Sequence, residues 1–487
     1  MQSPVSAAMD EESALFFPSE SDLDFSFTSF TTATSSSTTA RTSLARSSLT
    51  LSFNDRLSTT QESTNTTPLC SRPHRARDPH WSAIKTALNL SSDGALHLRQ
   101  LKLLRHLGTG NLGRVFLCRL RDSDQVNNSC YALKVVDKDS LSPKKLSHVQ
   151  TEADILSLLD HPFLPTLYAH IEVSHYTCLL IDYCSGGDLH SLLRKQPGNR
   201  LSVKAVKFFA AEVLVALEYL HALGIVYRDL KPENILLRDD GHIMLSDFDL
   251  SFKADVVPTL IETRTTRRVA STSGTQCSCF GWENLSSSSN SDGVESEGEE
   301  TVTEFVAEPT AAFSKSCVGT HEYLAPELVS GMGHGNGVDW WAFGVLLYEL
   351  MYGTTPFKGG SKESTLRNIA SSRQVRFPDF EEEGMDEARE LIQKLLVKDP
   401  RRRLGCARGA TDIKRHPFFD GVKWALIRNY KPPAEVRGLE KKTKSKTHVS
   451  HVTRGSLSHS HPHRRRRFSR WWKGLGFNKK KKIGGLL

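Results

Sequence analysis

Residues 227–237 read YRDLKPENILL, and this stretch decides the fold. It places a carboxylate (Asp229), an ammonium group (Lys231) and an amide (Asn234) close together, directly before a short apolar run. Such groups can accept a proton from a hydroxyl, stabilise a phosphoryl group during transfer and hold a magnesium ion. Residues of these types in this order rarely form a simple turn between a helix and a strand pair. The stretch therefore predicts a phosphoryl-transfer site.

A second candidate metal ligand, Asp247, follows Asn234 across the predicted hairpin NILLRDDGHIMLSD. This span can bring both oxygen ligands to one ion, and magnesium prefers few carboxylates together with phosphate oxygens. In the sequence LSDFDLSF, Asp249 occupies a position where glycine would give the backbone more freedom. Because Asp tolerates left-handed conformations better than most residues, we expect Asp249 to restrict this loop without abolishing its active form.

A glycine-rich stretch, GTGNLGRV, lies between two strand-like segments. A hairpin of this kind can cover the phosphates of ATP with backbone N–H groups, whereas a dinucleotide fold would place the glycines between a strand and a helix. A turn without a ligand is the alternative. The residues expected to contact the nucleotide are Leu107, Gly108, Thr109, Gly110, Asn111, Leu112, Gly113, Arg114 and Val115.

Lys134, in the apolar strand-like segment YALKVV, is the next candidate. We expect it to face inward, bind the α and β phosphates and be held by a carboxylate on the following helix. Glu152 in TEADIL is the best-placed carboxylate, with Asp154 as the alternative. The competing interpretation of Lys134 is a surface lysine.

The composition divides the chain into folded and unfolded parts. Residues 1–95 are acidic at first and then rich in Ser and Thr, which predicts disorder. Alternating apolar segments from residue 97 predict a small antiparallel sheet, and periodic segments after about residue 150 predict helices. An irregular, partly acidic insertion occupies residues 253–313, and the helical pattern resumes and then stops near residue 419.

The charge is concentrated in one tail. Residues 441–487 contain 15 Lys and Arg and no Asp or Glu, so the preceding residues carry a net charge of −7 although the whole chain carries +8. This distribution favours a local electrostatic anchor over a nucleic-acid-binding fold. The nine cysteines form no CxxC pair and the N-terminus has no signal-peptide pattern, so we expect a reducing cytosolic or nuclear setting. No apolar run is long enough to predict a membrane span.

Taken in order from residue 101 to 419, these motifs resemble the eukaryotic protein kinase fold. YRDLKPEN, GTHEYLAPE and the tail elements Trp424 and NYKPP are similar to the AGC group of Ser/Thr kinases. The DFD sequence and the long insertion resemble the plant-specific class of that group. The phrases LDHPFLPTLYAHIEVSHYTCLLIDYCSGGDLHSLLRKQP and SKSCVGTHEYLAPELV look most similar to the PINOID and WAG kinases.

The resemblance implies an α+β, bilobal fold and transfer of the ATP γ-phosphate to Ser or Thr, with ATP and Mg²⁺ as cofactors. It implies a small, mainly antiparallel β lobe at about 101–182, a large helical lobe at about 183–419, an AGC-type extension at 420–450 and a basic aromatic tail at 451–487. The implied catalytic residues are Asp229, Lys231, Asn234, Lys134 and Glu152, and the implied metal ligands are Asn234 and Asp247. Asp229 would be the proton acceptor.

The resemblance also implies regulation and substrate choice. Arg228 would pair with a phosphate on Ser316 in the activation loop, with Ser314 as the second candidate. Glu233 and Glu349 match positions that hold a basic residue two places before the phosphoacceptor, so we expect a preference for R-x-S sites. Asp188 matches a position where an acidic residue faces the ribose or another substrate arginine. The family suggests PIN-type auxin efflux carriers as substrates and control of polar auxin transport.

The sequence RRRRFSRWWKGLGFNKKKK at 464–482 interleaves cations with aromatic residues. Such a segment favours anionic membrane lipids, with a nuclear import signal or a solvated tail as alternatives. The F-x-x-F motif by which many AGC kinases dock on the phosphoinositide-dependent upstream kinase is missing, which puts that docking mode in doubt. We expect a monomer that binds no nucleic acid and works at the plasma-membrane periphery and in the cytoplasm, with the nucleus as an alternative. A pseudokinase scaffold is the competing hypothesis, supported only by Asp249.

Overall fold

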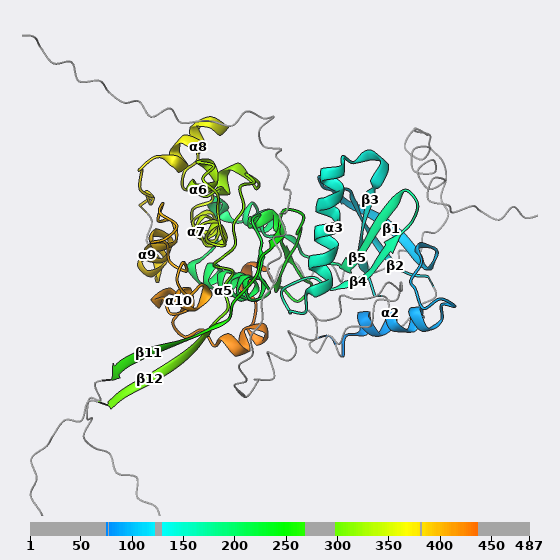
Figure 1. Cartoon of the computed structure of the whole chain (residues 1–487), viewed down its shortest axis with the longest axis horizontal. Helices are drawn as coiled ribbons and strands as arrows, with labels where there is room; N and C mark the ends of the chain where they lie inside the picture. Colours follow the sequence, from blue (N-terminus) through cyan, green and yellow to red (C-terminus); the bar gives the residue numbers. More distant parts are fainter. Residues whose placement is uncertain (1–74, 76, 122–128, 268–297, 380–381, 437–487) are drawn as a thin grey trace, which may run out of the picture.

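The computed structural model describes Arg75 and residues 77–121, 129–267, 298–379 and 382–436, with backbone alone at 262–267 and 298–304. The small lobe is built on a five-stranded antiparallel sheet in the order β1-β2-β3-β5-β4, as the sequence predicts (Figure 1). The strands are β1 (Leu101–Thr109), β2 (Arg114–Leu120), β3 (Tyr131–Asp137), β4 (Leu167–Glu172) and β5 (Tyr176–Asp182).

One long helix, α3 (Pro143–Leu158), belongs to the small lobe. Ser142 caps its N-terminus, since its side chain accepts a hydrogen bond from the backbone N–H of Lys145, and Pro143 fits the first turn because it needs no hydrogen-bond donor there. The helix buries an apolar face that includes Ile155 and Leu156, together with one carboxylate, Glu152. A buried carboxylate requires a partner, and this one is described with the site below.

A helix that the sequence did not predict, α2 (Pro79–Asn89), precedes the sheet. The prediction of disorder over residues 1–95 is therefore wrong for this part. Trp81 and Ile84 are buried in the core of the small lobe, where the Trp81 ring packs on Tyr168 at 5.7 Å between centroids. Arg75 anchors the segment through Asp182, with a nitrogen-to-oxygen distance of 3.0 Å. The segment is polar in composition, but burial of Trp81 and Ile84 in the core of the small lobe stabilises it as a helix.

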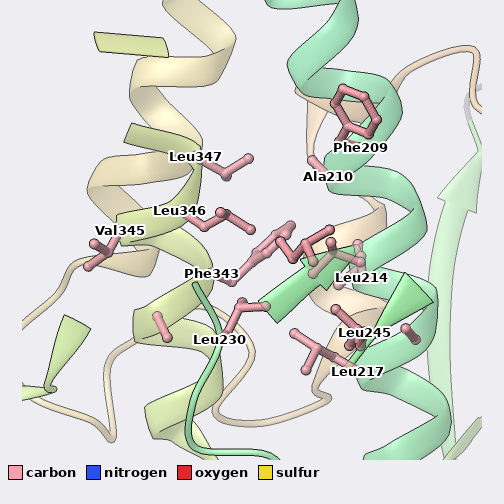
Figure 2. Packing of buried hydrophobic residues seen from close by; sticks show 14 of the residues in the cluster. Phe209, Ala210, Leu214, Leu217, Leu230, Leu245, Phe343, Val345, Leu346 and Leu347 are labelled. Atoms are coloured by element: carbon pink, nitrogen blue, oxygen red, sulfur yellow. The ribbon is translucent and has the colours of Figure 1, made fainter. Parts of the chain in front are cut away.

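The large lobe is mainly helical and is organised around two buried helices, α5 (Val203–Ala222) and α7 (Gly337–Tyr352). Figure 2 shows Leu214 and Leu217 of α5 facing Phe343 and Leu346 of α7 across a shared apolar core. Each fully buried side chain of this size contributes about 1.5–3 kcal/mol. This core is the rigid base on which the loop at 227–234 lies.

The remaining elements of the large lobe are short. The helices are α4 (Leu189–Leu193), α6 (Pro326–Val329), α8 (Lys362–Ala370), α9 (Met385–Leu395) and α10 (Ala410–Lys414), and the strands are β6 (Gly187–Asp188), β7 (Ile225–Val226), β8 (Ile235–Leu237), β9 (Ile243–Leu245) and β10 (Phe252–Lys253). Short 3-10 helices across both lobes are η3 (Leu98–Gln100), η4 (Lys138–Ser140), η5 (Pro197–Asn199), η6 (Pro232–Asn234), η7 (His321–Tyr323), η8 (Pro417–Phe419) and η9 (Trp424–Asn429).

The insertion at 253–313 is more regular than the sequence suggested. Its two flanks form an antiparallel ribbon of β11 (Thr259–Arg267) and β12 (Gly298–Val306), which projects from the large lobe in Figure 1. β11 contains four Thr and one Ile, and β12 contains two Thr and two Val; these residues favour extended structure and are consistent with the ribbon. The centre of the insertion lies outside the described residues.

Several predictions from the sequence concern other segments that lie outside the described residues. These are the disorder of residues 1–74, the end of the extension beyond residue 436 and the basic aromatic tail. Within the described ranges, no helix combines the length and the apolar character that crossing a membrane would need.

Candidate active site

The loop at 227–234 runs between β7 and β8. Its backbone is hydrogen-bonded to a buried carboxylate of α7. The two carboxylate oxygens of Asp339 accept hydrogen bonds from the backbone N–H groups of Tyr227 and Arg228, each at 2.8 Å. Arg228 adopts a left-handed conformation with φ of 68°. A non-glycine residue in this conformation is strained, so the contacts to Asp339 help to hold it there.

Asp229, Lys231 and Asn234 converge at one point, as the sequence predicts. Nζ of Lys231 lies 2.6 Å from Oδ2 of Asp229, and Nδ2 of Asn234 donates to the same oxygen at 2.8 Å. Two donors therefore fix the orientation of the Asp229 carboxylate. The side chain of Asp229 is almost fully buried, which keeps its position independent of bulk water.

Thr320 is a site residue that the sequence analysis quoted only as part of a family motif. Its Oγ1 donates to Oδ1 of Asp229 at 3.2 Å and accepts from Nζ of Lys231 at 2.9 Å. The segment after the insertion thus touches the loop at 227–234 directly. Its place in GTHEYLAPE was the only available signal, because residues so far apart in sequence meet only in the fold.

Lys134 of β3 pairs with Glu152 of α3 and not with Asp154. The Nζ of Lys134 lies 2.7 and 2.6 Å from the two carboxylate oxygens of Glu152 and 3.3 Å from Oδ1 of Asp247. Burial alone would lower the pKa of Lys134, but the charges of Glu152 and Asp247 outweigh it and raise the pKa above its usual value. Lys134 is therefore a fixed cation that faces the site, and the surface-lysine alternative is wrong.

The two predicted metal ligands lie where a cation could use them. Nδ2 of Asn234 is engaged with Asp229, which leaves the amide oxygen without a hydrogen bond among the described residues. The Asp247 carboxylate is 40% exposed and pairs with Lys134 in the described chain. One carboxylate and one amide oxygen fit magnesium, which takes its remaining ligands from water and phosphate.

The backbone at 247–249 differs from the expectation based on the sequence. The residue with positive φ is Asp247, at 61°, and Asp249 is not among the described residues with positive φ. The backbone at position 249 is therefore not left-handed, and a side chain there causes none of the strain that a positive φ would bring. Burial and the neighbouring charge of Asp247 raise the pKa of Asp249 to about 7.

The glycine-rich stretch forms the predicted hairpin between β1 and β2, closed by a hydrogen bond from the N–H of Gly110 to the carbonyl of Gly113. A side chain at Gly113 would place its Cβ 2.4 Å from the carbonyl oxygen of Val135, so only glycine fits against β3. Added Cβ atoms at Gly108 and Gly110 would meet no atom within 4 Å. The open space beside these two residues fits a ligand that approaches the backbone closely.

Arg228 also reaches the activation segment. Its Nη1 donates to Oγ of Ser316 at 2.7 Å and to Oγ of Ser314 at 3.2 Å. Ser314 is buried and tied to His334 through two backbone hydrogen bonds, whereas Ser316 is partly exposed. Burial lowers the pKa of Arg228 to about 10, so the guanidinium stays charged at neutral pH.

The three acidic residues predicted to recognise substrate have different surroundings. Glu349 is buried and accepts a hydrogen bond from the Tyr323 hydroxyl at 2.7 Å, and burial with the nearby charge of Glu233 raises its pKa. Glu233 is half exposed. Asp188 caps α4, since its carboxylate oxygens accept from the N–H and the hydroxyl of Ser191 at 2.6 and 3.0 Å.

Further from the reacting groups, a buried ion pair joins Glu327 of GTHEYLAPE to Arg403. The two guanidinium nitrogens lie 2.7 and 2.9 Å from the two carboxylate oxygens. A bidentate pair of this kind fixes geometry as well as charge. It locks the end of the activation segment to the base of the large lobe.

The fold and this set of residues define a protein kinase, and the comparison with known proteins agrees. The protein kinase domain family model matches residues 101–271 and 301–419. The chain is 68% identical over 444 residues to the serine/threonine-protein kinase WAG1 of Arabidopsis thaliana, covering 89% of each chain. It is 63% identical over 472 residues to WAG2 of the same plant, covering 96% of this chain and 93% of that one.

A more distant relative is the serine/threonine-protein kinase AGC1-7 of Arabidopsis thaliana, with 48% identity over 395 residues, 76% of this chain and 69% of that one. The chain belongs to the protein kinase family and, within it, to the WAG/PINOID-like class of AGC Ser/Thr kinases. Kinases of this family use ATP with Mg²⁺ and phosphorylate protein substrates, and bound magnesium supplies neutralisation of the phosphate charge.

Proposed function

We propose that this kinase phosphorylates Ser in R-x-S sequences, and that PIN-type auxin efflux carriers are its substrates in the control of polar auxin transport. The observation that carries the R-x-S preference is the half-exposed carboxylate of Glu233, whose charge acts on the carboxylate of Glu349. A carboxylate pair favours a substrate arginine through charge-assisted hydrogen bonds. The carrier assignment rests on the similarity to the PINOID and WAG kinases.

Within the site, Asp229 accepts the proton of the attacking hydroxyl while Lys231 stabilises the phosphoryl group in transfer. Lys134 binds the α and β phosphates, held in place by Glu152. Asn234 and Asp247 hold magnesium. The backbone at 107–115 covers the nucleotide. The direct donors to Asp229 support this assignment, because a proton acceptor must be oriented before the substrate arrives.

A peptide array tests the substrate proposal. The chain incubated with ATP and magnesium is expected to label peptides with Arg two residues before Ser, and to label their Arg→Ala versions far less. Peptides from PIN-type carriers are scored on the same array. Equal labelling with and without arginine would contradict the R-x-S preference, while labelling of R-x-S peptides but of no carrier peptide would contradict only the carrier assignment.

Regulation by phosphorylation of Ser316 is part of this proposal. A phosphate adds about −1.5 to −2 charge and accepts several hydrogen bonds, and Arg228 already lies 2.7 Å from the hydroxyl that would carry it. The partial exposure of Ser316 favours it over the buried Ser314 as the modified residue. A phosphoinositide-dependent upstream kinase is the candidate enzyme for modification in trans.

We further propose that the chain acts as a monomer at the plasma-membrane periphery and in the cytoplasm, held to anionic lipids by the basic aromatic tail. The support is compositional: polybasic segments gain about 1 kcal/mol per Lys or Arg near an anionic leaflet. Cosedimentation with phosphatidylserine vesicles, compared with neutral vesicles, tests this. Binding that is equal for both vesicle types, or unchanged when the tail is deleted, would contradict it and favour the nuclear import alternative.

A further inference from the structure

Glu308 lies two residues after the end of β12, where the insertion rejoins the large lobe. Its side chain is buried against α5 and the start of α7. Oε2 of Glu308 lies 2.8 Å from Nδ1 of His221, in the last turn of α5, and accepts a hydrogen bond from Nδ2 of Asn336 at 2.7 Å. The end of the insertion is thus fixed by a carboxylate to two elements of the large lobe.

The other ring nitrogen of His221 contacts the residue that holds the loop at 227–234, called the catalytic loop below. Nε2 of His221 lies 2.9 Å from Oδ2 of Asp339, the carboxylate that holds the backbone N–H groups of Tyr227 and Arg228. A continuous chain of contacts therefore runs from Glu308 through His221 and Asp339 to the residues directly before Asp229. Because His221 and Asp339 are fully buried, these contacts are shielded from bulk water.

His221 is a cation in this arrangement. Asp339 accepts hydrogen bonds from two backbone N–H groups and Glu308 accepts one from Asn336, so both carboxylates face the ring as acceptors and favour a proton on each ring nitrogen. The groups that face the ring are Glu308, Asp339 and the edge-on ring of Trp340 at 4.7 Å. Burial alone would lower the pKa of His221, but the two carboxylates outweigh it and raise the pKa to about 10.

The backbone of Gly409 packs directly against the carboxylate of Glu308. Gly409 has φ of 57°, and an added Cβ there would lie 1.6 Å from Oε1 of Glu308. Any side chain at position 409 would therefore displace the carboxylate. At its other end the insertion leaves the lobe through β10, which pairs with β7, and the N–H of Ala254 donates to the carbonyl of Gly224 at 2.8 Å. Both ends of the insertion are thus attached to residues 221–226.

We propose that Glu308 is a positioning residue for phosphoryl transfer, which couples the insertion to the catalytic loop through His221 and Asp339. Glu308 keeps the imidazolium in place, the imidazolium orients the Asp339 carboxylate, and Asp339 orients the loop that carries Asp229. A partner that binds the ribbon β11–β12, or a modification of the ribbon, changes the rate of phosphate transfer through these contacts. The proposal rests on the kinase activity of the family and is independent of the substrate proposed above.

The test is the pH dependence of kcat in the full chain carrying Glu308→Gln. Gln keeps an oxygen for both hydrogen bonds but removes the charge that raises the pKa of His221. The pKa of His221 is then expected to fall below its value of about 10, so the ring loses a proton at a lower pH than in the wild type. We expect kcat to fall about tenfold between about pH 6.5 and about pH 9. The KM for ATP should not change, because neither residue touches the glycine-rich hairpin.

Two control variants test whether the alkaline fall in kcat of Glu308→Gln depends on His221. Glu383→Gln makes the same chemical change in an exposed pair with Lys204, at 87% and 84% exposure, and is expected to match the wild type. The double variant Glu308→Gln with His221→Gln should lose the alkaline fall in kcat, since no ring is left to titrate. Persistence of that fall in the double variant would overturn the proposal.

Other outcomes also decide the question. A kcat of Glu308→Gln that is unchanged, or lowered equally at every pH, would overturn the coupling through His221. Should Glu308→Gln not fold, Glu308→Asp provides the second measurement, because it keeps the negative charge near the ring. Its kcat profile is then expected to stay as flat as that of the wild type, and an alkaline fall would contradict the proposal.

Discussion

Nζ of Lys134 and the carboxylate of Glu152 form a buried ion pair with distances of 2.6 and 2.7 Å. Breaking a buried pair on one side leaves the other charge unpaired, which costs roughly 3–5 kcal/mol. Lys134→Met is therefore expected to lower both the free energy of unfolding and the affinity for ATP. Chemical denaturation and nucleotide titration measure the two effects.

Lys138→Met is the matched control, four residues further along the chain. Lys138 pairs with Glu172 at the surface, where an ion pair contributes about 0–1 kcal/mol. Its stability and ATP affinity should therefore stay near those of the wild type. If Lys138→Met lost as much ATP affinity as Lys134→Met, the specific function of the buried pair would be refuted.

Trp81 joins the N-terminal helix α2 to the core of the small lobe. Trp81→Ala is expected to lower the free energy of unfolding by about 3–5 kcal/mol, because it leaves a cavity against Tyr168. Leu90, next to α2 and 78% exposed, provides the comparison, and Leu90→Ala should change stability by less than about 0.5 kcal/mol. Similar, small effects of the two substitutions would mean that α2 is not part of the folded lobe.

Ser316 is predicted to be the activating phosphosite. Ser316→Ala should lower kcat about tenfold or more, since no phosphate can then pair with Arg228. Ser314→Ala should keep most of the activity, because the backbone bonds that hold Ser314 to His334 do not need its hydroxyl. Kinase assays with phosphopeptide mass spectrometry test this, and the reverse ranking of the two variants would assign the site to Ser314.

Substitution of Asp247 should lower the kinase activity far more than substitution of Asp249. Asp249→Gly is expected to keep kcat within about threefold of the wild type, since position 249 has no positive φ that would require glycine. Asp247→Asn should lose activity at every magnesium concentration tested, because the carboxylate ligand is gone. Steady-state assays over a range of magnesium concentrations measure both, and full activity of Asp247→Asn would contradict the metal assignment.

The sequence predicted the small-lobe sheet, the hairpin at 108–115 and the meeting of Asp229, Lys231 and Asn234, because each depends on a local pattern of fixed spacing. It left Glu152 and Asp154 as alternatives, since both lie on one helix and only packing decides which faces β3. It ranked Glu152 first, and the structure agrees.

Features that depend on distant partners escaped prediction. Nothing near Trp81 in the sequence indicates that the sheet supplies a partner surface for it. The sequence did not single out Glu308 within the partly acidic insertion, because its partner His221 lies far away along the chain. The conformation of Asp249 was anticipated from residue preference alone, whereas the fold places the left-handed residue at Asp247.

We expect this chain to transfer phosphate with Asp229 as the proton acceptor, although Asp249 replaces the usual glycine. The most direct measurement is the initial rate of phosphate transfer from ATP, with magnesium, to an R-x-S peptide by wild type and by Asp229→Asn. A clear rate for the wild type and a loss of about 10²-fold or more for the variant are predicted. Equal rates for the two proteins, or no transfer by either, would contradict the claim.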